Sequence, residues 1–296
     1  MKKKFSILIT LLIFGSIFGV TSVFSDDLDL EIKDFIIDYF VTETGQIYNN
    51  NTRSKDGFLK DTYNDNAFIL YIDGSLYSAS GDYTTEADGR EYVLDTEIMS
   101  DLIVYRKVYF PEDRNWIRYL EILHNPTSTL ITVEVQIDTP DLGSSDYTRC
   151  VKTSSGDTFA DVNDYWVVTD DELDGHSKSN PSLSHVWDGP GGADRIDYLS
   201  GLNDEEDRVN YYWYYVTVNP GQTVVLMHFG GFEMNNNNAI ALAQDLYNYK
   251  DDKMKYDLQE INQIINWSPS RLAKAGNKPS LPIAQIIKIL KGNQEN

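Results

Sequence analysis

The central part of the chain consists of short runs rich in Val, Ile, Tyr, Phe and Thr, separated by clusters of Gly, Pro, Asn and Asp. β-branched and aromatic residues favour strands, whereas the separating residues favour turns. A chain patterned in this way folds into antiparallel sheets joined by short connections. The runs at 67–72, 102–110, 116–123 and 130–137 are typical strands.

The run at 130–137 has a clear period of two. Every second residue is apolar: Ile131, Val133, Val135 and Ile137. This pattern predicts a strand with one packed face and one wet face. Together with 102–110 and 116–123, it predicts an antiparallel meander. A second meander is predicted at 211–218 and 223–229, because the Pro220-Gly221 pair between these runs suits a type II turn.

After residue 232 the apolar spacing changes to that of helices. Asn238 is the expected cap of a first helix, and a second helix is expected at 254–265. A linker and a short amphipathic helix would follow at 270–296, with its apolar stripe formed by Ile283, Ile286, Ile287 and Leu290. The predicted fold is therefore mainly β: an antiparallel β-sandwich or supersandwich at 26–232, closed by two to three C-terminal α-helices, of which those at 233–269 pack on the sandwich.

Two segments resemble known modules. Residues 118–128 (RYLEILHNPTS), with the strand that follows, resemble a piece of uncharacterised secreted bacterial β-sandwich modules. Residues 218–224 (VNPGQTV) resemble a turn of immunoglobulin-like and supersandwich domains. The resemblance implies a sandwich architecture and bacterial export. It implies no activity, because neither segment carries a catalytic signature.

The N-terminus predicts export. Lys2, Lys3 and Lys4 precede an apolar run at 5–20, which is typical of a signal peptide. Val23 and Ser25 are the small residues that a signal peptidase would read, and we expect cleavage between Ser25 and Asp26. The alternative is an uncleaved membrane anchor, since the run could just cross a bilayer. The expected location is extracellular, at the cell surface or periplasmic, with no membrane span after removal of residues 1–25.

The charge excludes some partners. Loss of the three leader lysines would change the formal net charge from −21 to −24, and such a surface repels nucleic acid and anionic lipid. The expected partners are a glycan or an envelope protein. Cys150 is the only cysteine, so no disulfide can form within the chain. Its strand-like surroundings favour a buried, inert thiol.

Catalytic candidates are few. His228, His185 and Glu233 could form an acid-base site of the sugar-epimerase kind on a supersandwich. A pairing of Glu121 with His124 is disfavoured, because residues three apart in a strand point to opposite faces. Isolated histidines more often serve packing or surface roles, and no nucleotide or hydrolase motif is present in the sequence.

A calcium site is the expected inorganic alternative. Asp170, Asp171 and Asp174 lie close together before Gly175 and offer the oxygen ligands that calcium prefers. Their spacing is not that of an EF-hand, and a solvated loop also explains them. The glycine-rich loop at 188–194 does not lead from a strand into a helix, so phosphate binding is not expected.

The run at 211–215 (YYWYY) places aromatic side chains on both faces of one strand. One face could stack on a sugar, with Trp213 and Tyr215 as the ligand-binding residues. Core packing would explain the other face and could explain both. The sequence thus favours a non-catalytic binding or structural module of the cell envelope or secretome that could bind glycans. The alternative is a carbohydrate-active enzyme or a sugar epimerase-like protein.

Overall fold

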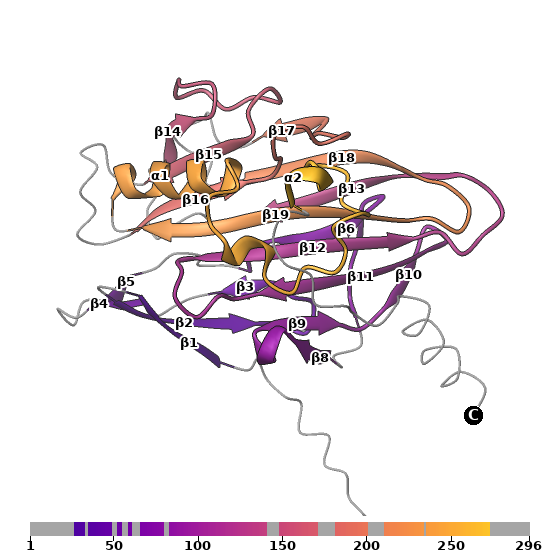
Figure 1. The fold of residues 1–296 in the computed structure, drawn as a ribbon, viewed down its shortest axis with the longest axis horizontal. Helices are drawn as coiled ribbons and strands as arrows, with labels where there is room; N and C mark the ends of the chain where they lie inside the picture. Colours follow the sequence, from indigo (N-terminus) through magenta and orange to yellow (C-terminus); the bar gives the residue numbers. More distant parts are fainter. Residues whose placement is uncertain are drawn as a thin grey trace, which may run out of the picture.

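The computed structural model describes residues 27–32, 35–48, 52–54, 59–60, 66–79, 83–140, 148–170, 181–200, 210–233 and 235–272. The expected leader with its cleavage site at Ser25 and Asp26 and the C-terminal helix expected within 270–296 lie outside these residues, as do Asp171 and Asp174. The described chain is mainly β and folds into three antiparallel sheets with few helices (Figure 1).

Three sheets contain all the named strands. The N-terminal sheet holds β1 (Asp27–Ile32), β2 (Phe35–Val41), β3 (Ile47–Tyr48), β4 (Thr52–Ser54) and β5 (Leu59–Lys60). The small sheet has the order β17 (Tyr198–Ser200), β18 (Asn210–Val218), β13 (Ile131–Thr139), β6 (Ile69–Ile72) and β7 (Ser75–Leu76). The large sheet has the order β14 (Arg149–Thr153), β15 (Trp166–Asp170), β16 (Ser182–Val186), β19 (Thr223–Glu233), β12 (Trp116–His124), β11 (Leu102–Tyr109), β9 (Glu91–Leu94) and β8 (Tyr83–Glu86), with β10 (Glu97–Met99) beside β11.

The centre of the fold is one long two-stranded ribbon that bends from the large sheet into the small sheet. β12 pairs with β19 in the large sheet, and their continuations β13 and β18 pair with each other in the small sheet. At the bend, Asn125 N–H donates to the Gln222 carbonyl at 3.0 Å, and Gly221 N–H donates to the Asn125 carbonyl at 2.8 Å.

This ribbon corrects both predicted meanders. The pair β11–β12 forms as expected, but β13 leaves for the other sheet and does not pair with β12. Likewise, the Pro220-Gly221 turn joins two sheets rather than two paired strands. The long-range partner β19 takes the edge of β12 that a hairpin would have used.

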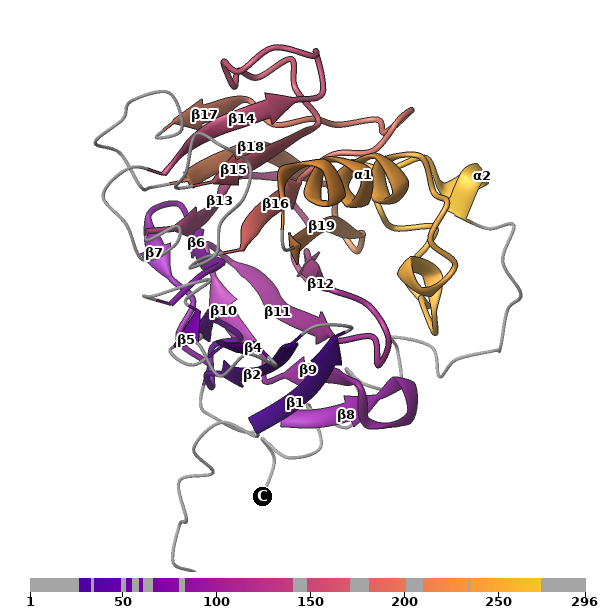
Figure 2. The ribbon, with the colours of Figure 1, turned by 90° about the vertical axis from the view of Figure 1, so that its left-hand side faces the viewer.

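The large sheet is buried on both faces. Its inner face packs on the small sheet around the main core, with Tyr119, Leu226 and Val135 among the buried residues. Its outer face is covered by helix α1 (Asn236–Tyr247) and the following chain, which supply a second core (Figure 2). Each fully buried large apolar side chain contributes about 1.5–3 kcal/mol to stability.

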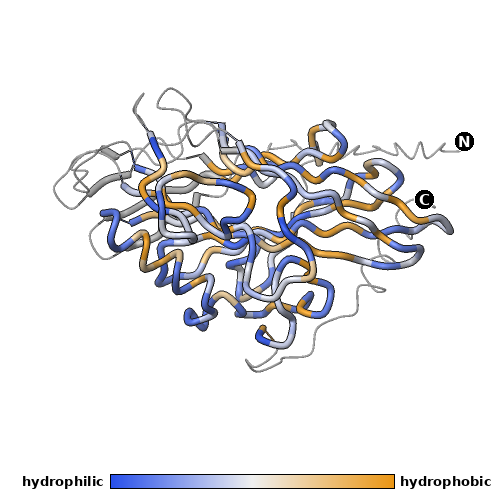
Figure 3. Tube along the Cα trace, turned by 90° about the horizontal axis from the view of Figure 1, so that it is seen from above, coloured by the Kyte–Doolittle hydropathy of each residue, from blue (hydrophilic) through white to orange (hydrophobic). Residues whose placement is uncertain are grey.

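The small sheet, by contrast, has one face that the rest of the described chain does not cover. Along β13 the residues from Thr132 to Thr139 alternate between less buried and buried positions. The same alternation of polar and apolar residues is visible along the strands in Figure 3.

The C-terminal segment packs as expected but is less helical than expected. α1 begins at Asn236, because the Asn235 side chain, rather than Asn238, caps it by accepting from the Asn238 N–H at 3.0 Å. The helix expected at 254–265 does not form. Only a 3₁₀ turn at Lys253–Lys255 is present, and Asp257 has a φ of 50°, which ends helical geometry there.

Backbone bonding to the sheet explains this departure. Val225 N–H donates to the Gln263 carbonyl at 2.9 Å, and Ile265 N–H donates to the Val225 carbonyl at 3.0 Å. These bonds satisfy groups that a helix would have paired internally. Three of the apolar residues expected on one face of that helix, Met254, Leu258 and Ile261, are nevertheless buried against the large sheet, whereas the fourth, Ile265, is partly buried and packs on the main core. A short helix, α2 (Pro269–Leu272), follows. Within the described residues, every helix is too short or too polar to span a bilayer.

Candidate functional site

The uncovered face of the small sheet carries a group of aromatic side chains on β17 and β18, which we call the aromatic face. It consists of Tyr198, Tyr211, Trp213 and Tyr215. Tyr215 is 53% exposed and Tyr198 is 37% exposed. Tyr212 and Tyr214 point the other way into the core, where they are 3% and 1% exposed. The aromatic run at 211–215 is therefore divided between the two faces of its strand.

Three of these rings stand nearly parallel. The Tyr198 and Trp213 rings stack with centroids 3.9 Å apart and an angle of 11°. The Tyr211 ring lies 6.1 Å from that of Trp213 at 19° and 5.9 Å from that of Tyr198 at 28°. Such stacking holds each ring in one orientation, while Tyr198 on the edge strand stays partly exposed to solvent.

The strand register places polar groups beside the rings. Trp213 pairs across to Gln136 on β13, and Gln136 pairs across to Tyr71 on β6. In the next rows, Asp138 lies opposite Tyr211 and Glu134 lies opposite Tyr215. Adjacent strands are about 4.8 Å apart, so Trp213 and Tyr71 flank Gln136 with about 10 Å between their backbones.

The polar groups of this face are partly oriented by one another. Gln136 Nε2 donates to Asp138 Oδ1 at 2.8 Å. Burial raises the pKa of Asp138 above its ordinary value, although the Gln136 bond opposes this shift. Burial, and then the charge of Asp138, raises the pKa of Tyr71, whose hydroxyl therefore stays protonated and able to donate. The face offers amide and hydroxyl donors as well as carboxylate acceptors.

Asp197 anchors the edge strand that completes the face. Its N–H donates to the Trp213 carbonyl at 2.8 Å, and its carboxylate accepts from the Tyr215 N–H at 2.7 Å. These bonds hold Tyr198, the next residue in the chain, against Trp213. Sequence reasoning identified Trp213 and Tyr215 but not Tyr198, Tyr71 or Gln136. The period of two in β13 predicted that Gln136 points outward. Which residues of β18 and β6 lie beside it depends on the strand register, which the sequence alone does not reveal.

His228 lies in the main core beside a different carboxylate from the one expected. Its Nε2 is 2.9 Å from Glu121 Oε1, and the same oxygen accepts from Arg106 at 2.6 Å. All three side chains are at most 1% exposed. Burial lowers the pKa of His228, although Glu121 opposes this shift. The ring is therefore neutral near pH 7, and Nε2 donates to the carboxylate.

His185, the second catalytic candidate, lies near this pair, because its ring and the His228 ring both face Phe68, at centroid distances of 6.4 and 5.8 Å. Burial lowers the pKa of His185 to about 3, so this ring is neutral at physiological pH. Glu233 ends β19 and accepts from Asn115 Nδ2 at 2.9 Å. His228 and Glu233 are five residues apart on β19, and no hydrogen bond or ion pair joins them in the described structure.

Asp170, the described member of the expected calcium group, ends β15 and is 2% exposed. Its carboxylate accepts from the Ser182 hydroxyl at 2.7 Å. Among the described residues, no cluster of three or more His, Cys, Asp or Glu side chains could hold a metal ion.

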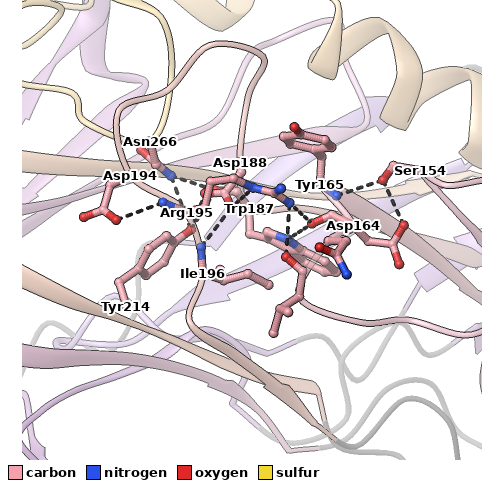
Figure 4. A network of polar contacts seen from close by, with 12 residues as sticks. Ser154, Asp164, Tyr165, Trp187, Asp188, Asp194, Arg195, Ile196, Tyr214 and Asn266 are labelled. Carbon is pink, nitrogen blue, oxygen red and sulfur yellow. Dashed lines mark hydrogen bonds and ion pairs between the residues drawn. The ribbon is translucent and has the colours of Figure 1, made fainter.

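The glycine-rich loop at 188–194 packs against the C-terminal segment. A Cβ at Gly189 would lie 2.0 Å from the Trp267 ring, and one at Gly192 would lie 2.4 Å from the Asn266 carbonyl carbon. Close packing thus explains both glycines. Asp188 at the start of this loop is buried and accepts from Tyr214 Oη and Ile196 N–H, both at 3.0 Å (Figure 4). Burial raises the pKa of Asp188 to about 7.

No protein-family model matches this chain, and no curated protein sequence does. Among solved structures, it is similar to a polysaccharide lyase at a TM-score of 0.45 and 11% identity, over 72% of this chain and 35% of the lyase. It is similar to a galactose mutarotase-like protein from Lactobacillus casei at 0.41 and 7%, over 70% of this chain and 100% of that one.

A third solved structure is a putative aldose 1-epimerase from Klebsiella pneumoniae, with a TM-score of 0.37 and 11% identity over 74% of this chain and 82% of that one. The match to the lyase spans about a third of that protein. Matches at these scores assign neither a family nor an activity to this chain.

Proposed function

We propose that this protein is an exported, non-catalytic module that binds a neutral glycan on its aromatic face. The observation that carries the proposal is the set of nearly parallel rings of Tyr198, Tyr211 and Trp213 beside the amide and carboxylate of Gln136 and Asp138. The C–H faces of a sugar pack on flat aromatic surface, and its hydroxyls bond to amide and carboxylate groups.

The charge of the face selects the kind of glycan. Asp138 and Glu134 lie beside the rings, and the whole chain has a formal net charge of −21. Both features repel acidic and sulfated polysaccharides. The ligand is therefore a neutral polysaccharide or oligosaccharide. The N-terminal leader supports export of the protein. Outside the cytoplasm, such glycans are displayed on cell surfaces or in the surrounding matrix.

The test is binding of residues 26–296 to an array of neutral and acidic glycans, with and without calcium. We expect neutral hits that Trp213→Ala weakens. A central aromatic contact contributes about 2 kcal/mol or more to binding, which corresponds to roughly thirtyfold in Kd. Phe159→Ala is the matched control, because Phe159 is 61% exposed and lies on the β14–β15 connection rather than on this face.

Two results would count against the proposal: an array without neutral hits, or hits that Trp213→Ala leaves unchanged while the protein stays folded. A requirement for calcium would instead support the metal site expected from Asp170, Asp171 and Asp174. Capture of a purified envelope protein, independent of Trp213, would favour a structural role.

The alternative is a carbohydrate-active enzyme, and one observation favours it. His228 and Glu121 form a hydrogen-bonded imidazole-carboxylate pair at 2.9 Å, which is a common acid-base arrangement. Both side chains are sealed in the main core, so a substrate could reach them only if the two sheets parted. Turnover of a defined sugar that His228→Gln abolishes, without a change in melting temperature, would support this alternative.

A further inference from the structure

A cavity of about 310 Å³ lies outside the aromatic face, between the β14–β15 connection and the C-terminal end of α1. Small-molecule sites usually have volumes of about 300–1,000 Å³. This cavity is at the lower end of that range, so it fits a ligand with one small ring and not an extended polysaccharide chain. Its lining includes Ser154, Ser155, Asn163, Tyr165, Gln244 and Tyr247.

The lining is polar but carries no formal charge. It contains no carboxylate, ammonium, guanidinium or imidazole group, and three of its eight residues are aromatic. The Tyr165 and Tyr247 rings lie 4.9 Å apart at an angle of 48°. Burial is the main cause that raises the pKa of Tyr247, so its hydroxyl is a neutral donor.

Several polar groups of the lining are free to bind a ligand. In the described part of the chain, no hydrogen bond engages the side-chain amides of Asn163 and Gln244 or the hydroxyls of Tyr165 and Tyr247. Amides and hydroxyls that both donate and accept match the hydroxyl groups of a neutral sugar. None of the lining residues is itself cationic, and the nearest guanidinium, that of Arg195, lies on the Tyr165 ring.

The wall formed by the β14–β15 connection is held in place from behind. The Asp164 carboxylate accepts from the Ser154 hydroxyl and the Ser155 N–H, each at 2.9 Å (Figure 4). The Arg195 guanidinium lies 4.0 Å from the centre of the Tyr165 ring and donates to the Asp164 carbonyl at 3.0 Å. These contacts orient the lining before a ligand arrives, which reduces the entropy cost of binding.

We propose that this cavity is a second ligand site, which binds one neutral pyranose ring beside the contacting Tyr165 and Tyr247 rings, through their hydroxyls and the Asn163 and Gln244 amides. The site does not depend on the proposed role of the aromatic face. A sugar would bind here whether or not the aromatic face binds a glycan.

The test uses titration calorimetry of residues 26–296 with methyl α-D-glucopyranoside, methyl β-D-galactopyranoside and methyl α-D-mannopyranoside, and with D-glucuronate as an acidic probe. We expect at least one neutral glycoside to bind with a millimolar Kd and D-glucuronate not to bind. Gln244→Leu and Tyr247→Phe each remove one hydrogen-bonding group, and each should raise the Kd about five- to tenfold. Both are conservative for folding, because Leu is a good helix former and Phe keeps the ring.

Asn237→Leu is the matched control, since it makes the same kind of change at an exposed position of α1 outside the cavity. It should leave the Kd unchanged. The loss caused by Gln244→Leu should be the same when Trp213→Ala is also present, because the aromatic face can then no longer contribute to binding. Binding by none of the three glycosides would overturn the proposal. So would binding that survives both cavity variants but is lost in Trp213→Ala, because the sugar would then occupy the aromatic face.

Discussion

Replacing Glu121 by Gln removes one charge from the main core while keeping the shape of the side chain. Glu121 and Arg106 are both 0% exposed, and their closest atoms are 2.6 Å apart. Burial alone would raise the pKa of Glu121, but the charge of Arg106 and the hydrogen bond from His228 outweigh it and lower the pKa. The carboxylate is therefore ionised at neutral pH, and Glu121→Gln leaves the Arg106 cation without a counterion.

Loss of one partner from a buried pair costs about 3–5 kcal/mol of folding free energy. The lower end applies here, because the Gln amide oxygen can still accept from Arg106, which also donates to the Thr44 and Phe68 carbonyls at 3.0 and 2.9 Å. For a domain of this size, each kcal/mol shifts the melting temperature by about 2–4 °C. We therefore expect Glu121→Gln to melt roughly 6–12 °C below the wild type at pH 7.

The assay is thermal unfolding followed by circular dichroism at several pH values. Because the folded pKa of Glu121 lies below the unfolded value, the stability it contributes is present above the unfolded pKa and is lost as the pH falls through the folded pKa. The difference between wild type and variant should therefore shrink below about pH 4. Glu134→Gln, at a partly exposed position of β13, is the control and should change stability by less than about 0.5 kcal/mol. A Glu121→Gln melting temperature within about 2 °C of the wild type at pH 7 would refute this reasoning.

Three further predictions concern other parts of the fold. Since the folded pKa of Asp188 is raised to about 7, its contribution to stability is present below the unfolded pKa and is lost as the pH rises through 7. In urea titrations, the free energy of unfolding of Asp188→Asn should therefore rise by roughly 2 kcal/mol relative to that of the wild type between pH 5 and pH 8. If the difference between the two proteins were the same at both pH values, the pKa of Asp188 would not be raised. Gly192→Ala should lower the free energy of unfolding by about 2 kcal/mol or more, because its Cβ would lie 2.4 Å from the Asn266 carbonyl carbon, and a wild-type melting curve would show that the loop has room. Burial raises the pKa of Cys150 to about 12, so a thiol reagent at pH 8 should modify it only as fast as the protein unfolds, and rapid modification of the native protein would be inconsistent with its buried position.

The sequence predicted the class of fold because its local signals are strong. The period of two in β13 identified a strand with one wet face, and the turn at Asp73-Gly74 separates β6 from β7. The sheet to which each strand belongs was not predictable in this way. The turns at Asn125-Pro126 and Pro220-Gly221 have the composition of hairpin turns, but they are the two corners of one bent ribbon.

The candidate sites show the same division between local and long-range information. Trp213 was identified from its own segment, whereas its stacking partner Tyr198 and its row neighbour Gln136 come from distant parts of the chain. Glu121 was considered with His124, three residues away, yet it lies beside His228, 107 residues away. A single sequence contains no record of such pairings, because they depend on strand register.

The bent ribbon also determines when, during synthesis of the chain, the central strands of the two sheets can pair. Thr139 pairs with Asn210 and Trp116 pairs with Gly231, so the small sheet lacks its central pairing until β18 has been made, and the large sheet lacks its own until β19 has been made. Pairings over such separations are slow to form. The chain therefore remains without its central strand pairings for most of its synthesis on the ribosome.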